Sequence, residues 1–185
     1  MSRTRVMQLL FSLTLVLLPA VVAAAPPGGL GPYRLGMKPA DVQAVKDCAP
    51  YKPVETTGGL ECAKFTIAGK TRNISFIFDP DAGLKKIQLW FAEGATPAAA
   101  TAAVRELIAF VSKTYGAVES NGLPAGAPVT VKALMAAVDT EGKVQIKPKR
   151  EPAYAFVFAS ILKDPTHGWF VFFYVQPPRT TTPPR

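Results

Sequence analysis

Hydrophobic and polar residues alternate most regularly between residues 60 and 91. A period of two indicates strands with one buried face, and turn-forming residues separate these strands at 68–71 and 79–83. The segments are 60–67, 73–78 and 84–91, and the apolar positions of the last two are Ile74, Phe76, Phe78, Ile87, Leu89 and Phe91. The pattern predicts an antiparallel meander of three strands.

The spacing of apolar residues changes to that of a helix between residues 97 and 115. Thr96 is a suitable N-cap, Pro97 is a suitable first residue, and Gly116 is a typical stop. The apolar stripe comprises Ala100, Val104, Leu107, Ile108 and Val111. The pattern predicts one long helix that packs on the sheet through this stripe.

Two other segments have less regular patterns. A short helix is predicted over 39–47, with Pro39 in its first turn. Residues 129–138 fit a strand or a helix, and we favour a helix because Leu134 and Met135 are good helix formers.

Three more strands are predicted at 144–147, 154–162 and 169–175, and the last two are apolar on both faces. Strands of this kind lie inside a sheet that is covered on both sides, or one of their faces covers a partner. The pattern does not decide between these two arrangements.

These elements predict an α+β fold, a mainly antiparallel sheet of about six strands in two meanders with two or three helices packed on it. Residues 33–176 form a single predicted domain, and its halves (33–93 and 97–176) share an outline that suggests an internal repeat. We expect residues 25–32 to be a flexible lead-in and 177–185 to be a disordered Pro/Thr/Arg tail. A proline-rich docking motif is the alternative for the tail.

Residues 1–24 have the pattern of an export signal. Arg3 and Arg5 precede an apolar stretch from Val6 to Leu18, and small residues suit cleavage after Ala24. The stretch is shorter than the roughly 20 residues that cross a bilayer as a helix, so we favour cleavage over an uncleaved membrane anchor. We predict an exported mature chain without a transmembrane span, located in the bacterial periplasm or outside the cell.

Charge and cysteine content fit an exported domain. The net charge is +8, and it becomes +6 without Arg3 and Arg5. We attribute this charge to solubility, with anionic lipid, glycan or an acidic protein as alternative partners. Cys48 and Cys62 are predicted to form a disulfide in an oxidising compartment rather than to remain free thiols.

A family resemblance begins at residue 35, where the chain reads Leu35-Gly36-Met37-Lys38-Pro39-Ala40-Asp41-Val42-Gln43-Ala44-Val45. This segment resembles the Gly-Met-x-x-x-(acid/polar)-Val start of a helix in small exported bacterial proteins with the outer-membrane assembly lipoprotein (SmpA/OmlA-like) fold. That fold is similar to the repeat unit of β-lactamase inhibitory proteins. The chain departs from it by lacking the lipoprotein cysteine, by having one short helix before its first meander, and by showing the motif once. The resemblance implies helices packed on an antiparallel meander and a role in binding another protein, and it assigns no functional residue.

The chain carries few residues that could support catalysis. His167 is its only histidine and lies in a Asp-Pro-Thr-His-Gly segment with the chemistry of a turn. A Cys/His dyad and a multi-histidine zinc site are therefore not expected. Asp79 and Asp81 could offer oxygens to calcium, but the remaining ligands of a calcium loop are missing and a hairpin turn is favoured.

Carboxylates leave one catalytic alternative open. Glu55, Glu61 and Glu93 could form an acid pair if the fold brings them together. We nevertheless predict a protein that is not an enzyme and that uses no cofactor or metal.

Two surface features could contact a partner. Trp90 lies on the opposite side of its strand from Ile87, Leu89 and Phe91, where it could anchor another protein. The favoured interpretation is that the long helix covers that side. The densest basic tract comprises Lys143, Lys147, Lys149 and Arg150. It could bind phosphate or acidic polysaccharide, but we favour a charged strand end that discourages edge-to-edge pairing.

The sequence thus predicts an exported, non-catalytic binding or envelope-accessory protein. Its expected partner is another envelope or secreted protein, and nucleic acid is not expected as a partner. The alternative is an exported hydrolase that uses a carboxylate pair.

Overall fold

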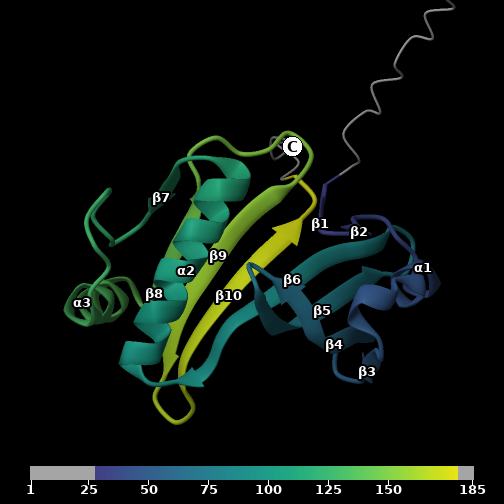
Figure 1. Ribbon diagram of the computed structural model, residues 1–185, viewed down its shortest axis with the longest axis horizontal. Helices are drawn as coiled ribbons and strands as arrows, with labels where there is room; N and C mark the ends of the chain where they lie inside the picture. Colours follow the sequence, from purple (N-terminus) through teal and green to yellow (C-terminus); the bar gives the residue numbers. More distant parts are fainter. Residues whose placement is uncertain (1–27, 179–185) are drawn as a thin grey trace, which may run out of the picture.

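The computed structural model of the chain describes residues 28–178. The predicted leader, and the predicted tail beyond Pro178, lie outside the described residues. The strands of the main sheet are β3 (Lys52–Val54), β4 (Gly59–Ile67), β5 (Lys70–Asp79), β6 (Gly83–Ala95), β7 (Val118–Ser120), β8 (Lys143–Pro148), β9 (Phe156–Asp164) and β10 (Gly168–Gln176). They form one antiparallel sheet in the order β3-β4-β5-β6-β10-β9-β8-β7, so the two halves of the chain meet where β6 pairs with β10 (Figure 1).

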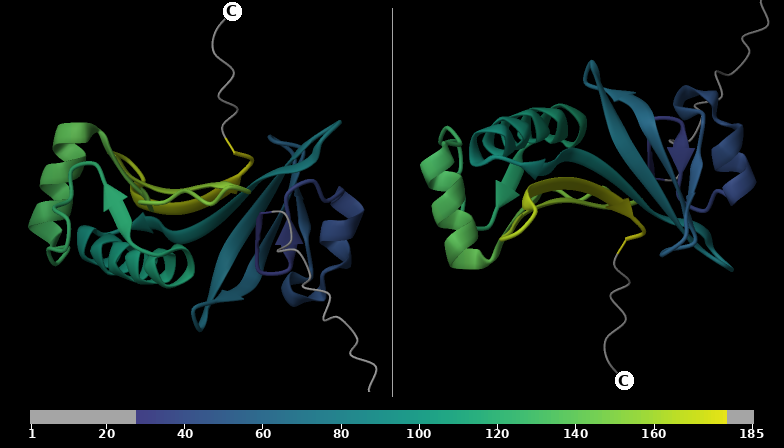
Figure 2. Two further views of the ribbon diagram at one scale, coloured as in Figure 1. Left: turned by 90° about the horizontal axis from the view of Figure 1, so that it is seen from above. Right: turned by 90° about the horizontal axis from the view of Figure 1, so that it is seen from below.

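The helices lie against one face of this sheet. They are α1 (Pro39–Ala44), the 3₁₀ helix η1 (Lys46–Cys48), α2 (Pro97–Tyr115) and α3 (Val131–Glu141). The long helix α2 packs on β6, β10 and β8, and α3 packs at the β8 end of the sheet. Figure 2 shows that β9 and β10 are bowed, with α2 on their convex side; no helix of the described residues lies on their concave side.

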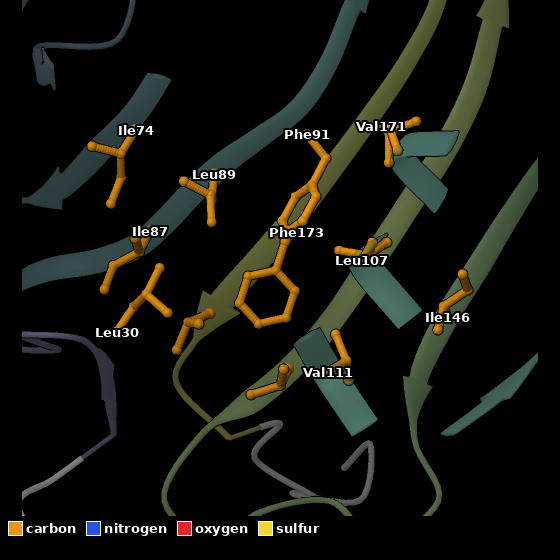
Figure 3. Close-up of a cluster of buried hydrophobic side chains, with 14 of the residues drawn as sticks. Leu30, Ile74, Ile87, Leu89, Phe91, Leu107, Val111, Ile146, Val171 and Phe173 are labelled. Atoms are coloured by element: carbon orange, nitrogen blue, oxygen red, sulfur yellow. The ribbon is translucent and has the colours of Figure 1, made fainter. Parts of the chain in front are cut away.

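The core lies between α2 and the inner face of the sheet. Leu107 and Val111 of α2 face Phe173 of β10 and its neighbours on β6 (Figure 3), and all three side chains are almost fully buried. The inward positions on β5 and β6 include the alternating residues Ile74, Phe76, Ile87, Leu89 and Phe91. The alternation in the sequence therefore predicted the buried face of these strands correctly.

The main elements follow the sequence prediction closely. The long helix spans the predicted residues 97–115, and Thr96 accepts a hydrogen bond from the backbone N–H of Ala99 as its N-cap. The segment 129–138 is helical, as favoured, and α3 begins after the N-cap Thr130. The predicted short helix ends earlier than expected, at Ala44, and continues as η1.

The strand count was too low. The main sheet has eight strands rather than about six, because β3 and β7 were missed. Each of these edge strands has only three residues, which is too short to show alternation. A separate two-stranded sheet, β1 (Gly29–Leu30) with β2 (Tyr33–Arg34), was also missed.

The expectation of a flexible lead-in is wrong from Gly29 onward. Leu30 and Tyr33 of the β1–β2 hairpin are buried, with 4% and 0% of their surface exposed. The Tyr33 hydroxyl lies 2.9 Å from that of Tyr51, which donates to the backbone oxygen of Val45 at 2.7 Å. Burial in the core, which the Gly-rich local sequence does not reveal, therefore fixes this segment.

Gly83 fixes the start of β6 against the segment that carried the family resemblance. Its φ is +78°, and a Cβ at this position would lie 2.8 Å from the backbone oxygen of Met37. The next residue, Leu84, donates its backbone N–H to the same oxygen at 2.7 Å and accepts from Gly36 at 2.8 Å. A side chain at residue 83 would therefore push these two backbones apart.

We expect Gly83→Ala to lower the free energy of unfolding by about 3 kcal/mol, since left-handed strain of about 1–2 kcal/mol is combined with a backbone clash. Gly69 is the matched control, because its φ is +74° but a Cβ there would meet nothing within 4 Å. Gly69→Ala should lose only the strain, about 1 kcal/mol. Urea titration of both variants checks this, and equal losses would contradict the role of the Gly83 contact.

Candidate functional site

The helix-free face of the sheet carries a row of aromatic side chains. Residues 169, 171, 173 and 175 of β10 point into the core, so Phe170, Phe172 and Tyr174 point to the opposite face. Phe172 lies opposite Trp90 on β6, and Tyr174 lies opposite Phe158 on β9. The pairing of β10 with both neighbours therefore collects aromatic residues from three strands.

We call this group the aromatic strip, and its members are Trp90, Phe156, Phe158, Phe170, Phe172 and Tyr174. The rings form a continuous series of contacts. Ring centroids are 4.6 Å apart for Trp90 and Phe172, 5.9 Å for Phe172 and Tyr174, 4.8 Å for Tyr174 and Phe158, and 5.0 Å for Phe158 and Phe156. Phe170 adds a stacked contact with Phe172 at 5.8 Å.

The aromatic strip is packed but still partly open. Phe156 and Phe172 are buried, with 4% and 8% of their surface exposed, while the other four members are half-buried. Partly open aromatic rings that are gathered on one face of a sheet make that face a candidate interaction surface. Large aromatic residues are also the residues that contribute most binding energy at protein interfaces.

Polar and basic groups border the aromatic strip on β5 and β6. The indole N–H of Trp90 donates to the Ser75 hydroxyl at 3.4 Å, and Lys86 places its ammonium 4.3 Å from the centre of the Tyr174 ring. Burial lowers the pKa of Lys86 and raises the pKa of Tyr174 to about 12. The strip therefore already holds one cation over an aromatic ring.

The basic tract reaches the same face from β8. Lys143 lies opposite Leu162, which lies opposite Phe170 of the aromatic strip. Lys147 lies opposite Glu119, and its ammonium is 3.2 Å from that carboxylate. Lys149 and Arg150 are exposed beyond the end of β8. Two of the four basic residues therefore border the helix-free face, and two lie outside it.

The favoured interpretation of Trp90 is wrong. The long helix covers the opposite side of β6, where Phe110 of α2 packs against Phe91 with ring centroids 6.0 Å apart. The half-buried state of Trp90 comes from Phe172 rather than from a helix. Trp90 therefore lies on the same face of the sheet as Lys143 and Lys147, although these lysines are far from Trp90 in the sequence.

Sequence reasoning missed most of this site. Phe156, Phe158, Phe170, Phe172 and Tyr174 were noted only as parts of strands with two apolar faces. That pattern was the available signal, and within residues 28–178 the helices cover only one face of the sheet (Figure 2). Lys86 gave no signal, because its position over Tyr174 depends on the pairing of β6 with β10.

The other candidate sites are turns or separated residues. Asp79 accepts backbone hydrogen bonds from Asp81 and Ala82, as the predicted hairpin turn requires. Asp164 accepts from the backbone and the ring of His167. These bonds lower the pKa of both aspartates.

The carboxylates considered for catalysis are dispersed in the sheet. Glu61 lies on β4 and Glu93 on β6, with β5 between them, and Glu55 lies in the turn after β3. Within residues 28–178, no group of three or more His, Cys, Asp or Glu side chains could hold a metal ion.

Cys48 and Cys62 form the predicted disulfide, with Cα atoms 5.9 Å apart. Across the same described range, no helix is both long enough and apolar enough to span a bilayer. Comparison with protein-family models, curated proteins and solved structures gives no match.

Proposed function

We propose that the chain is an exported, non-catalytic binding protein of the bacterial envelope, and that it contacts another envelope or secreted protein through the aromatic strip. The observation that carries this proposal is the contiguous row of partly open aromatic rings on the face of the sheet that none of the helices in residues 28–178 covers. The leader-like sequence at residues 1–24 and the Cys48–Cys62 disulfide support export. The resemblance of residues 35–45 to small exported binding proteins agrees with this role.

Trp90 is the residue of choice for a direct test. Its half-buried side chain contacts the ring of Phe172 and donates a hydrogen bond to Ser75, and a partner would bury the rest of its surface. We expect Trp90→Ala to reduce the affinity for the partner about thirtyfold, because a hot-spot tryptophan contributes about 2 kcal/mol or more. The measurement is quantitative capture from envelope extract, followed by titration with the captured protein.

Tyr154 provides a matched control. It is an exposed aromatic residue outside the strip, with 46% of its surface accessible. Tyr154→Ala should leave capture unchanged, and thermal melting of both variants checks that they remain folded. Equal capture by the parent chain and a folded Trp90→Ala variant would refute the proposal.

A further inference from the structure

A cavity of about 320 Å³ lies at the C-terminal end of α2. Its walls come from α2, the β1–β2 hairpin, the end of β4 and the segment before β9. We call it the α2 cavity, and its lining includes Arg34, Ile67, Phe110, Tyr115 and Tyr154. Its volume is at the lower end of the range for small-molecule sites, about 300–1,000 Å³. Because α2 forms one wall, the cavity lies on the helix-covered face of the sheet, whereas the aromatic strip lies on the other face.

Three aromatic rings line the α2 cavity, those of Phe110 and Tyr115 on α2 and that of Tyr154. Phe110 and Tyr115 also pack against Phe173 in the core, with ring centroids 5.3 and 6.1 Å from that of Phe173. The core therefore holds these two rings in place, and a ligand would not have to order them. Aromatic rings pair with one another in offset or edge-to-face contacts, so a ligand with an aromatic body suits this lining.

Arg34 gives the α2 cavity its charge. Among the described residues that line the cavity it is the only charged one, and it is half-buried. Its Nη1 donates to the backbone oxygens of Gly31 and Tyr33, the second at 2.8 Å. These carbonyls hold the guanidinium in place without neutralising it, and no ion pair within residues 28–178 involves Arg34. A negatively charged ligand would supply the missing counter-charge.

The open side of the guanidinium indicates which anion fits. Neither Nε nor Nη2 of Arg34 has a hydrogen-bond partner within the described part of the chain. These two nitrogens form a side of the guanidinium that can bind a carboxylate through two parallel hydrogen bonds. One carboxylate balances the charge of one arginine. A phosphate monoester carries about −1.5 to −2 at neutral pH and would bring excess charge into a half-buried site.

Two phenol hydroxyls can also donate to a ligand. The hydroxyls of Tyr115 and Tyr154 make no hydrogen bond to any residue from 28 to 178. Burial raises the pKa of Tyr115 to about 12, and Tyr154 contributes a smaller part of this increase. The Tyr115 hydroxyl is therefore protonated at neutral pH and can donate to a carboxylate oxygen.

We propose that the α2 cavity binds a small aromatic carboxylate. The ring of the ligand lies among Phe110, Tyr115 and Tyr154, and its carboxylate accepts hydrogen bonds from Nε and Nη2 of Arg34. The protein then binds a small molecule in addition to the partner proposed for the aromatic strip. The two proposals are independent, because they use different residues on opposite faces of the sheet.

The first test compares four ligands of similar size by their effect on backbone amide signals in ¹H–¹⁵N spectra of the chain from Ala25 to Arg185. The probe is 3-phenylpropionate, and we expect a Kd of about 1 mM or lower, as is usual for so small a ligand. The alcohol 3-phenylpropan-1-ol lacks the charge and 3-phenylpropylamine reverses it, so both should bind at least about tenfold more weakly. Octanoate keeps the carboxylate but lacks the ring, and it should bind about threefold more weakly or less well still.

The second test changes the protein. Arg34→Gln removes the charge of the cavity, and Lys132→Gln is the matched control because Lys132 is an exposed lysine on α3. Arg34→Gln should weaken the binding of 3-phenylpropionate about tenfold and leave that of the alcohol unchanged, whereas Lys132→Gln should change neither. Tyr115→Phe and Tyr154→Phe each remove a hydroxyl and keep the ring, so they test the site even if Arg34→Gln disturbs the β1–β2 hairpin. Each should weaken 3-phenylpropionate about twofold to tenfold.

The position of the shifted signals locates the ligand. The amide signals of Gly31 and Tyr115 should shift with 3-phenylpropionate, and the indole signal of Trp90 should not. Shifts confined to Trp90 and its neighbours would overturn the proposal, as would the lack of saturation at about tenfold above the expected Kd. Equal binding of the alcohol and the carboxylate, or equal effects of Arg34→Gln and Lys132→Gln, would refute the role of Arg34. Octanoate binding as tightly as 3-phenylpropionate would refute the assignment of an aromatic ligand.

Discussion

Replacing Glu106 by alanine is expected to lower the free energy of unfolding by about 3 kcal/mol, the lower part of the range for breaking a buried ion pair. Glu106 lies on α2 and accepts hydrogen bonds from Arg72 and Lys70 at the start of β5. Only 7% of the Arg72 side chain is exposed. Removing the carboxylate would leave a buried guanidinium without its counter-charge.

The surroundings of Arg72 explain why little could replace the carboxylate. Its Nη1 donates to the backbone oxygen of Phe91 at 3.1 Å, and the guanidinium lies 4.1 Å from the centre of the Phe91 ring. Its Nε is buried without a hydrogen-bond partner among the described residues. Glu106 is therefore the group that balances this charge between helix and sheet.

Lys70 is the matched control, since it binds the same carboxylate at 2.8 Å but has 64% of its side chain exposed. Lys70→Ala should cost about 1 kcal/mol or less, as exposed ion pairs do. Chemical denaturation of the parent chain and both variants gives the comparison. Equal losses for Glu106→Ala and Lys70→Ala would contradict the assignment of the buried pair.

Acid titration adds an independent reading of the same contact. Burial alone would raise the pKa of Glu106, but the hydrogen bonds and charges of Lys70 and Arg72 outweigh it and lower the pKa. Because the folded-state pKa is lower than the unfolded-state pKa of about 4.3, the ionised carboxylate stabilises the folded chain above about pH 4.3. This stabilisation is lost as the pH falls through the folded-state pKa. Glu106→Gln should therefore flatten the loss of stability below about pH 4 relative to the parent chain.

The local pattern of the sequence determines more of the fold than of the site. Alternation in Ile87, Leu89 and Phe91 predicted the buried face of β6, and Thr96 with Gly116 predicted both ends of α2. These signals are local, since capping and side-chain direction depend on near neighbours. The hairpin containing Leu30 escaped prediction because its order depends on burial in the core.

The aromatic strip requires information that no local pattern carries. Trp90 and Phe172 meet only because β10 inserts next to β6, which joins the two halves of the chain. Which side of β6 the long helix covers is likewise a matter of tertiary packing. The two-sided pattern of β9 and β10 could have indicated a second aromatic face once Trp90 was placed beside it.

The Cys48–Cys62 disulfide should stabilise the first half of the sheet by about 3 kcal/mol, the chain-entropy estimate for a loop of this length. The bond joins η1 to β4, at a sequence separation of 14 residues, and both cysteines are buried. Reduction of the parent chain, or replacement of both cysteines by alanine, releases this loop in the unfolded state. We expect the urea midpoint to fall, with the slope of the transition rising because the unfolded chain becomes less compact.

The stabilising effect of the disulfide is expected to be separate from the aromatic strip. The disulfide lies on the inner side of β4, whereas the strip is formed by β6, β9 and β10 on the helix-free face. The variant with both cysteines replaced by alanine should therefore keep the Trp90 indole N–H signal of the parent chain in ¹H–¹⁵N spectra, at temperatures where the variant remains folded. An unchanged urea midpoint would contradict the stabilising role of the bond, and a displaced Trp90 signal in the folded variant would show that the strip depends on the N-terminal half of the sheet. The cysteine variant then changes the free energy of unfolding and leaves the strip intact, whereas Trp90→Ala changes the strip and leaves the disulfide intact.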